Sequence, residues 1–463
     1  MACVRGTPGF DRSPGSGPVP RTLRLGVRVS LDWLKPRRYR HFDLPVNEAF
    51  AQKAMNPAVV SRHAFSPLIH YTKTETRYKK CPKTGVRTIT RKKRPIKYAA
   101  HRDACILSYY AHQINRALDT RYKEMGISDN VIAYRPLGRG NYDFAAEAMT
   151  YAQAEAPVVI LAFDITSFFD TLDHGLLKQR LKSLLGVHEL SDDWYKVFRS
   201  VTRFHYVDLE ELKAHPVFGQ RLKKKRRDQI ASMEELKAEG IAFHANPELA
   251  KGHRRGIPQG TPISAAVSNL YMMDFDIAAK ACCDKLGALY RRYSDDILVI
   301  CKPDDALAIE AEILRLIATE KLEIAPHKTE KTLFEKGRAI PRTTKAAQYL
   351  GFTFDESGPA IRESSLARQW RKMRRAMRRA KKSAQWRIAA GLPGKVHTKK
   401  LYRRFVYIKV HDGDTIRTLR NFSSYGRRSA DAFGQGEKIS RQVKRFEQAA
   451  LREIEKLKTS SST

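Results

Sequence analysis

The stretch YRRYSDDILVI at residues 290–300 constrains the fold more than any other part of the sequence. Two adjacent carboxylates, Asp295 and Asp296, lie between a basic, aromatic approach and the apolar run 297–300. Aspartate is a poor strand former, and neighbouring carboxylates repel each other. A hairpin with Ser294, Asp295 and Asp296 in its turn would hold both acids in place, and a divalent cation would neutralise them. The alternative is a solvated Asp-Asp turn with no chemical role.

A further acid, Asp164, ends the apolar run PVVILAFD at residues 157–164. Such a run is typical of a strand buried on both faces, where an acid is costly without a partner. If neighbouring strands bring Asp164 beside Asp295 and Asp296, the three acids can hold two metals about 3.5–4 Å apart, as in-line phosphoryl displacement requires. Oxygen ligands favour Mg²⁺ or Mn²⁺.

The charge balance points to a polyanionic partner. The chain has 86 Lys and Arg against 49 Asp and Glu, a net charge of +37. Nucleic acid is the commonest partner of such a chain, and an anionic membrane is the alternative. No apolar span of about 20 residues is present, so we expect no membrane helix. The six cysteines form no CxxC pair, which suits a reducing cytosol and a cytoplasmic protein. Charge and acids together indicate nucleotidyl transfer.

Local patterns predict the elements around these acids. Residues 70–103 are basic, with Thr and Val alternating around a KTG turn, which predicts a cationic β-hairpin. Helical spacing follows over 104–126. Residues 205–255 are charged and predict an irregular surface excursion, followed by a Gly/Pro loop that opens a helix with Ser264 as N-cap. Residues 366–388 alternate an apolar stripe with Arg and Lys, which predicts a basic amphipathic helix.

Several motifs resemble those of reverse transcriptases. The palm motifs of that family are matched in order by LAFDITSFFDTLDH, GIPQGTPISAAVSNLY, YSDD, APHKTEKT and QYLGFTF. The upstream segments RPIKYAAHRDACIL and AYRPLGRGNYDFAAEA resemble the finger motifs of the bacterial group II intron and retron-like branch. The resemblance covers roughly residues 70–355. It implies an α/β right-hand polymerase with a ferredoxin-like palm, fingers and a basic helical thumb.

The chain divides into four expected parts, of which the first follows from its Gly, Pro and Ser content and the other three from the resemblance. We expect a disordered leader without a secretory signal over residues 1–25, and an N-terminal extension with the fingers over 26–157. The palm would occupy 158–355, including the excursion 205–255, and the basic helical thumb 356–463.

Catalytic roles carry over residue by residue. Asp164, Asp295 and Asp296 match the family's catalytic carboxylates, with Asp164 and Asp295 as ligands of both metals. The backbone carbonyl of Ile165 would complete the coordination, and Lys328 matches the lysine that protonates the leaving pyrophosphate.

Substrate-binding roles carry over in the same way. Phe169 matches the steric gate that excludes a ribose 2′-OH, and Gln259 lies in the loop that lines the nascent base pair. The triphosphate would be held by three cations: Arg135, Arg94 and Lys97. The alternative readings are a core phenylalanine, a surface lysine at 328 and cations that contact template phosphate.

The subfamily follows from what the C-terminal part does not contain. The sequence has no CxxC-bearing nuclease module and neither the NAxxH nor the VTG hallmark of retrons. It therefore looks most like the "unknown group" and defence-associated enzymes, which act against phage with a partner noncoding RNA. A retron or group II intron-type enzyme and a catalytically silent RNA-binding scaffold are the alternatives, whereas the apolar Phe169 disfavours an RNA-dependent RNA polymerase. Template, primer and oligomeric state stay open at this point.

Overall fold

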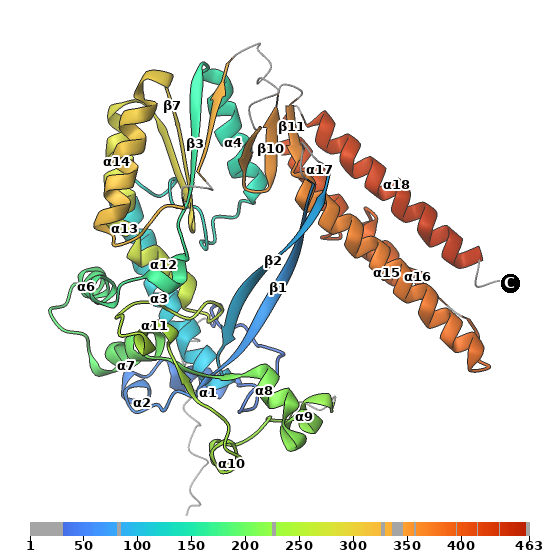
Figure 1. The fold of residues 1–463 in the computed structure, drawn as a ribbon, viewed down its shortest axis with the longest axis horizontal. Coiled ribbons are helices and arrows are strands. Elements are labelled where there is room, and N and C mark those ends of the chain that lie inside the picture. Colours follow the sequence, from blue (N-terminus) through green and yellow to red (C-terminus); the bar gives the residue numbers. More distant parts are fainter. Residues whose placement is uncertain are drawn as a thin grey trace, which may run out of the picture.

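The computed structural model describes residues 31–80, 85–224, 228–325, 329–335, 346–355, 358–394, 396–413, 415–434 and 436–459. The expected leader at 1–25 and Lys328 lie outside these residues. Figure 1 shows three regions: a sheet flanked by helices, a long two-stranded ribbon that crosses the molecule, and a pair of long helices that ends at the C-terminus.

The palm is built around a four-stranded antiparallel sheet. Its strands are β3 (Val158–Asp164), β6 (Leu289–Tyr293), β7 (Asp296–Cys301) and β8 (Glu330–Phe334), in the order β6-β7-β3-β8. Helices α12 (Ser264–Tyr271) and α13 (Met273–Lys285) form the last part of the long connection from β3 to β6, and α14 (Ala306–Thr319) connects β7 to β8. This β-α-β-β-α-β order with antiparallel pairing is the ferredoxin-like arrangement.

Both faces of this sheet are covered, which explains its continuous apolar strands. Leu161 and Val299 pack into a core cluster with α13 and α14, whereas Ile160 and Ile300 pack into a second cluster with α4 (Asn141–Ala154). Because side chains alternate between faces along a strand, β3, β6 and β7 each contribute to both clusters. The expectation of a doubly buried strand at 157–164 is confirmed.

The fingers contain the cationic hairpin. Strands β1 (Leu68–Lys80) and β2 (Arg87–Tyr98) pair antiparallel from Ile69↔Tyr98 to Lys80↔Arg87, and the KTG turn lies partly outside the described residues. The following helix, α3, spans His101–Glu124, as its periodicity predicted. Two short helices, α1 (Glu48–Ala54) and α2 (Pro57–Ser61), precede the hairpin.

The segment 205–255 is not the irregular excursion that its charges predicted. Strand β4 (His205–Asp208) pairs with β1 and with β5 (His244–Ala245), and so extends the fingers sheet. Apolar residues spaced along the segment, including Val207, Phe218 and Leu236, form a separate buried cluster with Ile69 of β1. The charged residues of this segment lie between those apolar positions, so the sequence pattern did not indicate a buried core. The segment also contains α8 (Leu209–Ala214), α9 (Pro216–Lys223), α10 (Met233–Ala238) and α11 (Pro247–Ala250).

The thumb is dominated by two long helices. Helix α15 (Glu363–Ala389) agrees with the predicted helix 366–388, and its buried Met373 and Met377 pack against α18 (Glu437–Thr459). Ile388 was expected in the same stripe but is 56% exposed, because it lies in the last turn of the helix. The rest of the region consists of β9 (Ala347–Tyr349), β10 (Phe352–Asp355), β11 (Gly358–Ile361), α16 (Thr398–Phe405), β12 (Lys409–Asp412), β13 (Thr415–Thr418) and α17 (Phe422–Ala432).

Three further short helices complete the described elements: α5 (Phe168–Thr171), α6 (His174–Leu185) and α7 (Asp192–Thr202), with a 3₁₀ turn at Pro303–Asp305. Among the residues that the structure describes, no helix is both long enough and apolar enough to span a bilayer.

Candidate active site

The three acids meet where β3 ends beside the β6–β7 hairpin. Asp164 and Asp296 are directly opposite each other across the antiparallel β3–β7 pair. The backbone N–H of Ile165 donates to the carbonyl oxygen of Asp295 at 3.2 Å, which joins the end of β3 to the hairpin turn. The expectation that neighbouring strands bring Asp164 beside Asp295 and Asp296 is thereby confirmed.

The hairpin turn itself is held in an unfavourable conformation. Ser294 has φ +62° and is buried, and a non-glycine residue in this left-handed region costs about 1–2 kcal/mol. Two contacts hold it there: its hydroxyl lies 3.0 Å from the hydroxyl of Tyr134, and its carbonyl accepts a hydrogen bond from Arg292 at 3.0 Å. The position of Asp295, the next residue, is therefore set by the surrounding protein.

A buried ion pair lies directly beneath this turn. Arg292 and Asp276 have fully buried side chains and form two short contacts, Nε to Oδ1 at 2.7 Å and Nη2 to Oδ2 at 2.6 Å. The Tyr290 hydroxyl donates to the same carboxylate at 2.6 Å. Although burial alone lowers the pKa of Arg292, the Asp276 charge raises it above its ordinary value. Arg292 is therefore charged whenever the protein is folded.

The same network reaches the fingers. The backbone N–H of Arg292 donates to the carbonyl of Asn130 at 2.7 Å, and the Asn130 side chain donates to the carbonyl of Tyr290 at 2.8 Å. Asn269 of α12 lies 3.3 Å from Arg292 Nη1 and donates to the carbonyl of Ala133 at 2.9 Å. The sequence analysis did not identify these residues. The signal that could have identified them is the two-residue spacing of Tyr290 and Arg292, which puts both side chains on the same face of β6.

A cleft of about 1050 Å³ opens beside the acids. It is bounded by the palm strands, the β9–β10 turn, the start of α15 and one side chain of the fingers hairpin, Lys92. Its lining includes Asp164, Asp296 and Arg368, whereas the described lining does not include Phe169 or Gln259. The cleft therefore brings two of the acids to one surface with cations from the fingers and the thumb.

The donor set suits a hard divalent cation. Asp164 and Asp295 are partly exposed and Asp296 is exposed, so carboxylate oxygens from both strands reach solvent at this point. Over the described ranges, no three His, Cys, Asp or Glu side chains already converge as in a preformed metal site. The residues fit Mg²⁺ or Mn²⁺ by donor chemistry, since these ions prefer oxygen ligands and keep part of their water shell.

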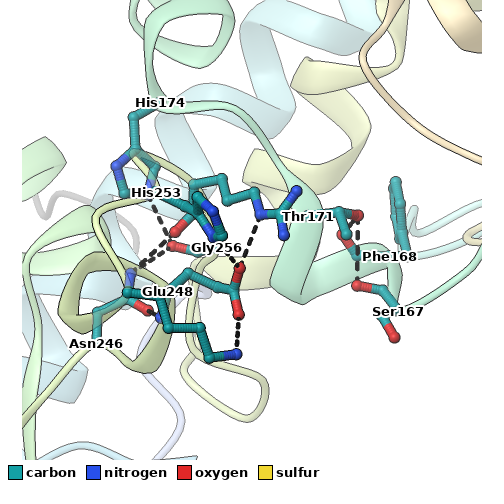
Figure 2. Close-up of polar contacts among 10 residues, drawn as sticks. Ser167, Phe168, Thr171, His174, Asn246, Glu248, His253 and Gly256 are labelled. Carbon is teal, nitrogen blue, oxygen red and sulfur yellow. Dashed lines mark hydrogen bonds and ion pairs between the residues drawn. The ribbon is translucent and has the colours of Figure 1, made fainter.

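The two aromatic residues after Asp164 differ in burial. Phe168 is buried in the core, whereas Phe169 is partly buried and packs at the edge of the same cluster, with the two ring centroids 5.5 Å apart. Ser167 before them has φ +46°, and its carbonyl accepts from the Asp170 backbone N–H at 2.7 Å. Figure 2 shows Ser167, Phe168 and Thr171 in this turn.

The Gly256–Gly260 loop is fastened to the rest of the protein. Gln259 accepts a backbone hydrogen bond from Lys97 at 2.8 Å, and a Cβ added at Gly260 would lie 2.7 Å from the Lys97 carbonyl. At Gly256 an added Cβ would lie 3.1 Å from the carbonyl of Asp170. Both glycines also have positive φ. The absence of a side chain at these two glycines therefore lets the loop lie close against the backbone at Lys97 and Asp170.

A polar network holds the start of this loop, as Figure 2 shows. His174 Nε2 lies 2.8 Å from the Gly256 carbonyl, and the Asn246 side chain donates to the same carbonyl at 3.1 Å. Glu248 binds Lys251 and Arg255, each at 2.8 Å, and these bonds lower the pKa of Glu248 to about 2. The loop start is thus held by groups on two separate segments, the start of α6 and the start of α11.

The three cations expected at the triphosphate lie in different surroundings. Arg94 pairs with Glu75 at 2.7 Å on the fingers hairpin. Lys97 is 5% exposed, with its ammonium over the rings of Phe204 and Tyr206 at 5.4 and 5.1 Å, and burial lowers its pKa.

Arg135 is held by contacts within the protein. Its side chain is buried and binds Asp119 at 2.7 Å, the Val131 carbonyl at 2.8 Å and two oxygens of Ser128. Its guanidinium also stacks 4.9 Å from the Tyr122 ring. These contacts use the Arg135 donors to fold the loop after α3, and its expected role at the triphosphate stays a prediction. The prediction that Ser264 is an N-cap is wrong by one residue. Ser264 is the first helical residue of α12, and its hydroxyl donates to the Pro258 carbonyl at 2.5 Å.

The ferredoxin-like sheet, with acids at the junction of β3 and the β6–β7 hairpin and a cleft toward a basic helical thumb, defines a right-hand polymerase. The sequence matches the family model described as reverse transcriptase (RNA-dependent DNA polymerase) over residues 82–354. The chain therefore belongs to the reverse transcriptase family. Comparison with curated proteins gives no significant match.

Two telomerase structures are among the solved structures most similar to this chain. Telomerase from Candida albicans in complex with the TWJ fragment of telomeric RNA has a TM-score of 0.42 and 13% identity, over 88% of this chain and 58% of that one. Apo telomerase from Candida tropicalis, truncated from its C-terminal domain, has a TM-score of 0.40 and 13% identity, over 63% of this chain and 54% of that one. The chain thus spans little more than half of their length, and likeness at these scores supports no further inference.

Proposed function

We propose that this protein is an RNA-directed DNA polymerase that adds deoxynucleotides to a primer 3′ end. The observation that carries the proposal is the cross-strand placement of Asp164 and Asp296, with Asp295 in the adjoining turn, at the wall of a cleft that also contains Lys92 and Arg368. The primer 3′-oxygen would form a bond to the α-phosphorus of the nucleotide, and the bond to the β-phosphate oxygen would break to release pyrophosphate.

In this proposal Asp164, Asp295 and the Ile165 carbonyl hold two Mg²⁺ ions, with Mn²⁺ as a substitute and Asp296 as a further carboxylate. Bound there, the ions supply the charge that makes the 3′-hydroxyl a better nucleophile and neutralises the triphosphate. The protein's own contribution is position: the buried Arg292–Asp276 pair and the strained Ser294 keep Asp295 beside the end of β3. Rigid support of this kind is what a catalytic constellation needs.

The remaining substrate roles are proposals from the family motifs. Phe169 would exclude a ribose 2′-OH, Gln259 would line the nascent base pair, and Lys328 would give its proton to the leaving pyrophosphate. Arg94, Lys97 and Arg135 form the proposed triphosphate-binding set, and Arg135 would have to exchange part of its contacts with Asp119 and Ser128 to reach it. We also propose the division into fingers (26–157), palm (158–355) and thumb (356–463), with 205–255 joined to the fingers sheet.

Primer extension on an RNA template tests the activity. The native chain with a DNA primer annealed to RNA, Mg²⁺ and dNTPs is expected to extend the primer, and Asp295→Ala is expected to bind the same duplex without extending it. Extension by both chains would show that the acid site is not catalytic. Absence of extension by the native chain on RNA and DNA templates alike would leave an RNA-binding scaffold.

At a finer level, we propose a bacterial enzyme of the defence-associated branch that copies a partner noncoding RNA, with a retron or group II intron-type role as the alternative. Sequencing of the nucleic acids that copurify with the native chain and with Asp295→Ala/Asp296→Ala tests this. One discrete RNA in both samples, with complementary DNA only in the native one, is expected. A broad mixture of cellular RNAs would contradict a dedicated template.

A further inference from the structure

Helix α15 has cations on two opposite sides, and only one side faces the catalytic cleft. Ser365, Arg368 and Gln369 line that cleft. Each residue turns the helix by about 100°, so Arg374 and Arg378 lie about 170° and 130° around the helix from the middle of the arc that these three cleft-lining residues span. These two residues therefore point away from the cleft, toward the back of the thumb.

On that back side, α15 and α18 enclose a second groove of about 640 Å³. Five cations line it, three from α15 and two from α18: Arg374, Arg378, Lys381, Arg452 and Lys456. Glu453 is the acid among the described lining residues, and it lies 3.3 Å from Lys456. The cations exceed the acids by 5 − 1 = 4 in this lining, so the groove attracts anions.

The surface that a ligand would meet in this groove is cationic. Its floor contains Met373, Met377 and Leu457, which are buried between the two helices. The partly buried Trp370 also lines the groove, with the Arg374 guanidinium 5.7 Å from its ring centroid, so a cation lies over the apolar surface that an amphipathic peptide would need. A second copy of the chain, with its own net charge of +37, would be repelled.

We propose that this groove, formed by Arg374, Arg378, Lys381, Arg452 and Lys456, binds the phosphate backbone of a second, folded nucleic-acid segment. The inference rests on the proposed function, because it takes the cleft side of α15 to be occupied by the primer–template duplex. Arg374 and Lys381 are seven residues apart, about 10 Å along the helix, so this row of cations is long enough to contact more than one phosphate of a strand. A structured RNA that carries its template on a separate segment could then be held at both sides of the thumb.

Competition binding with the full chain tests the proposal. The chain is first saturated with a short unlabelled primer–template duplex, and a labelled RNA stem-loop is then titrated. The back variant is Arg374→Gln/Arg378→Gln/Lys381→Gln. The matched front variant, Arg368→Gln/Lys372→Gln/Arg379→Gln, removes three exposed cations from the cleft side of the same helix. Both variants change exposed side chains, and native unfolding temperatures verify their folding.

The expected result is a separation of the two sites. The saturated native chain still binds the stem-loop, the back variant binds it at least about tenfold more weakly, and its salt dependence falls by about 2–3 in slope, as three lost phosphate contacts predict. The front variant loses affinity for the primer–template and keeps the stem-loop. A stem-loop of DNA that binds equally well would support contact with the backbone alone.

Three results would overturn the proposal. The primer–template could displace the stem-loop completely from the native chain, which would mean one site. The two variants could lose the stem-loop equally. The back variant could bind the stem-loop normally and instead lose an acidic copurifying protein. None of these readouts needs polymerisation, so a chain that binds both ligands without extending a primer would refute the proposed function and leave the second site standing.

Discussion

Two hairpins of this chain present their charged residues in opposite ways. In β6–β7 the strand residues Ile297–Cys301 are buried, and the turn that carries Asp295 is fixed by the buried pair of Arg292 and Asp276. In β1–β2 the cations of the central part, such as Lys92, are exposed, and so is Ile89 at 60%. Most of the β6–β7 hairpin is therefore packed into the core, whereas the described cations in the middle of β1–β2 lie at the surface.

This difference in burial follows from the function of the charged groups on each hairpin. A carboxylate that shares a metal must be placed to within about 0.5 Å, and this requires buried support. A cation that meets a phosphate backbone works at longer range and gains little from rigidity. The comparison therefore predicts large, local effects of substitution at β6–β7 and small, additive ones along β1–β2.

The largest effect is expected at the acids. Asp164→Asn and Asp295→Asn should each lower single-turnover dNTP incorporation by about a thousandfold, since loss of a metal ligand removes several kcal/mol of transition-state stabilisation. Asp296→Asn should cost less, because its side chain is exposed. Asp304→Asn, an exposed acid beyond the other end of β7, is the control and should retain the native rate. An equal loss of incorporation rate in all four variants would show that the acids at the β3–hairpin junction are no more important than Asp304.

The next effect concerns the buried pair. Arg292→Met leaves the Asp276 carboxylate buried without its partner and should lower the free energy of unfolding by about 3–5 kcal/mol. Arg292→Met/Asp276→Leu should recover much of this loss, since both charges are then removed. Chemical denaturation measures both, with Arg291→Met, the partly exposed neighbour, as control. A stable Arg292→Met chain would show that the pair does not support the turn.

A pH effect is expected at the base of β1–β2. His41 is buried against Tyr98, the last residue of β2, and its Nε2 lies 3.2 Å from the Tyr98 carbonyl. Burial lowers the pKa of His41 to about 3. Between about pH 6.5 and 3 the unfolded chain binds a proton that the folded chain does not, so stability is full above pH 6.5 and is lost as the pH falls.

The unfolding free energy should therefore decline by up to about 1.4 kcal/mol per pH unit below pH 6.5 through this group. His41→Gln should show a shallower slope over the same interval. His188→Gln, a substitution of an exposed histidine, should keep the native slope. Identical slopes in all three chains would mean that His41 is not linked to folding.

The smallest effect is expected on the arms of β1–β2. Lys92→Gln should weaken primer–template binding about threefold and lower the salt slope by about 0.7–0.9, with a stability change under about 0.5 kcal/mol. Fluorescence anisotropy at several salt concentrations measures this. Lys93→Gln is the matched control, because the next residue of a strand faces the other side. If Lys93→Gln weakens binding more, the cleft does not lie on the Lys92 face.

The sequence predicted those parts of the site that depend on local pattern. The doubly buried strand before Asp164, the hairpin around Ser294 and Asp295, and the basic helix 366–388 each follow from periodicity and turn chemistry. Strand pairing then placed the acids together, as expected.

Contacts between distant elements could not be predicted in this way. Arg292 looks like one more cation in a basic approach, and only the packing of β6 against α13 gives it Asp276 as a buried partner. Arg135 belongs to a family motif, yet its donors satisfy the loop at Ser128 and Val131. In both cases the partner is chosen by three-dimensional packing, which local sequence patterns do not contain.

Mn²⁺ binding followed by electron paramagnetic resonance tests the central claim most directly, because it asks whether the two strands together form one metal site. With primer–template and dNTP present, the native chain is expected to bind Mn²⁺ at the site, and Asp164→Asn and Asp295→Asn are each expected to lose that binding, although the two residues lie on different elements. Unchanged Mn²⁺ binding in either variant would contradict a metal site at the junction of β3 and the β6–β7 hairpin.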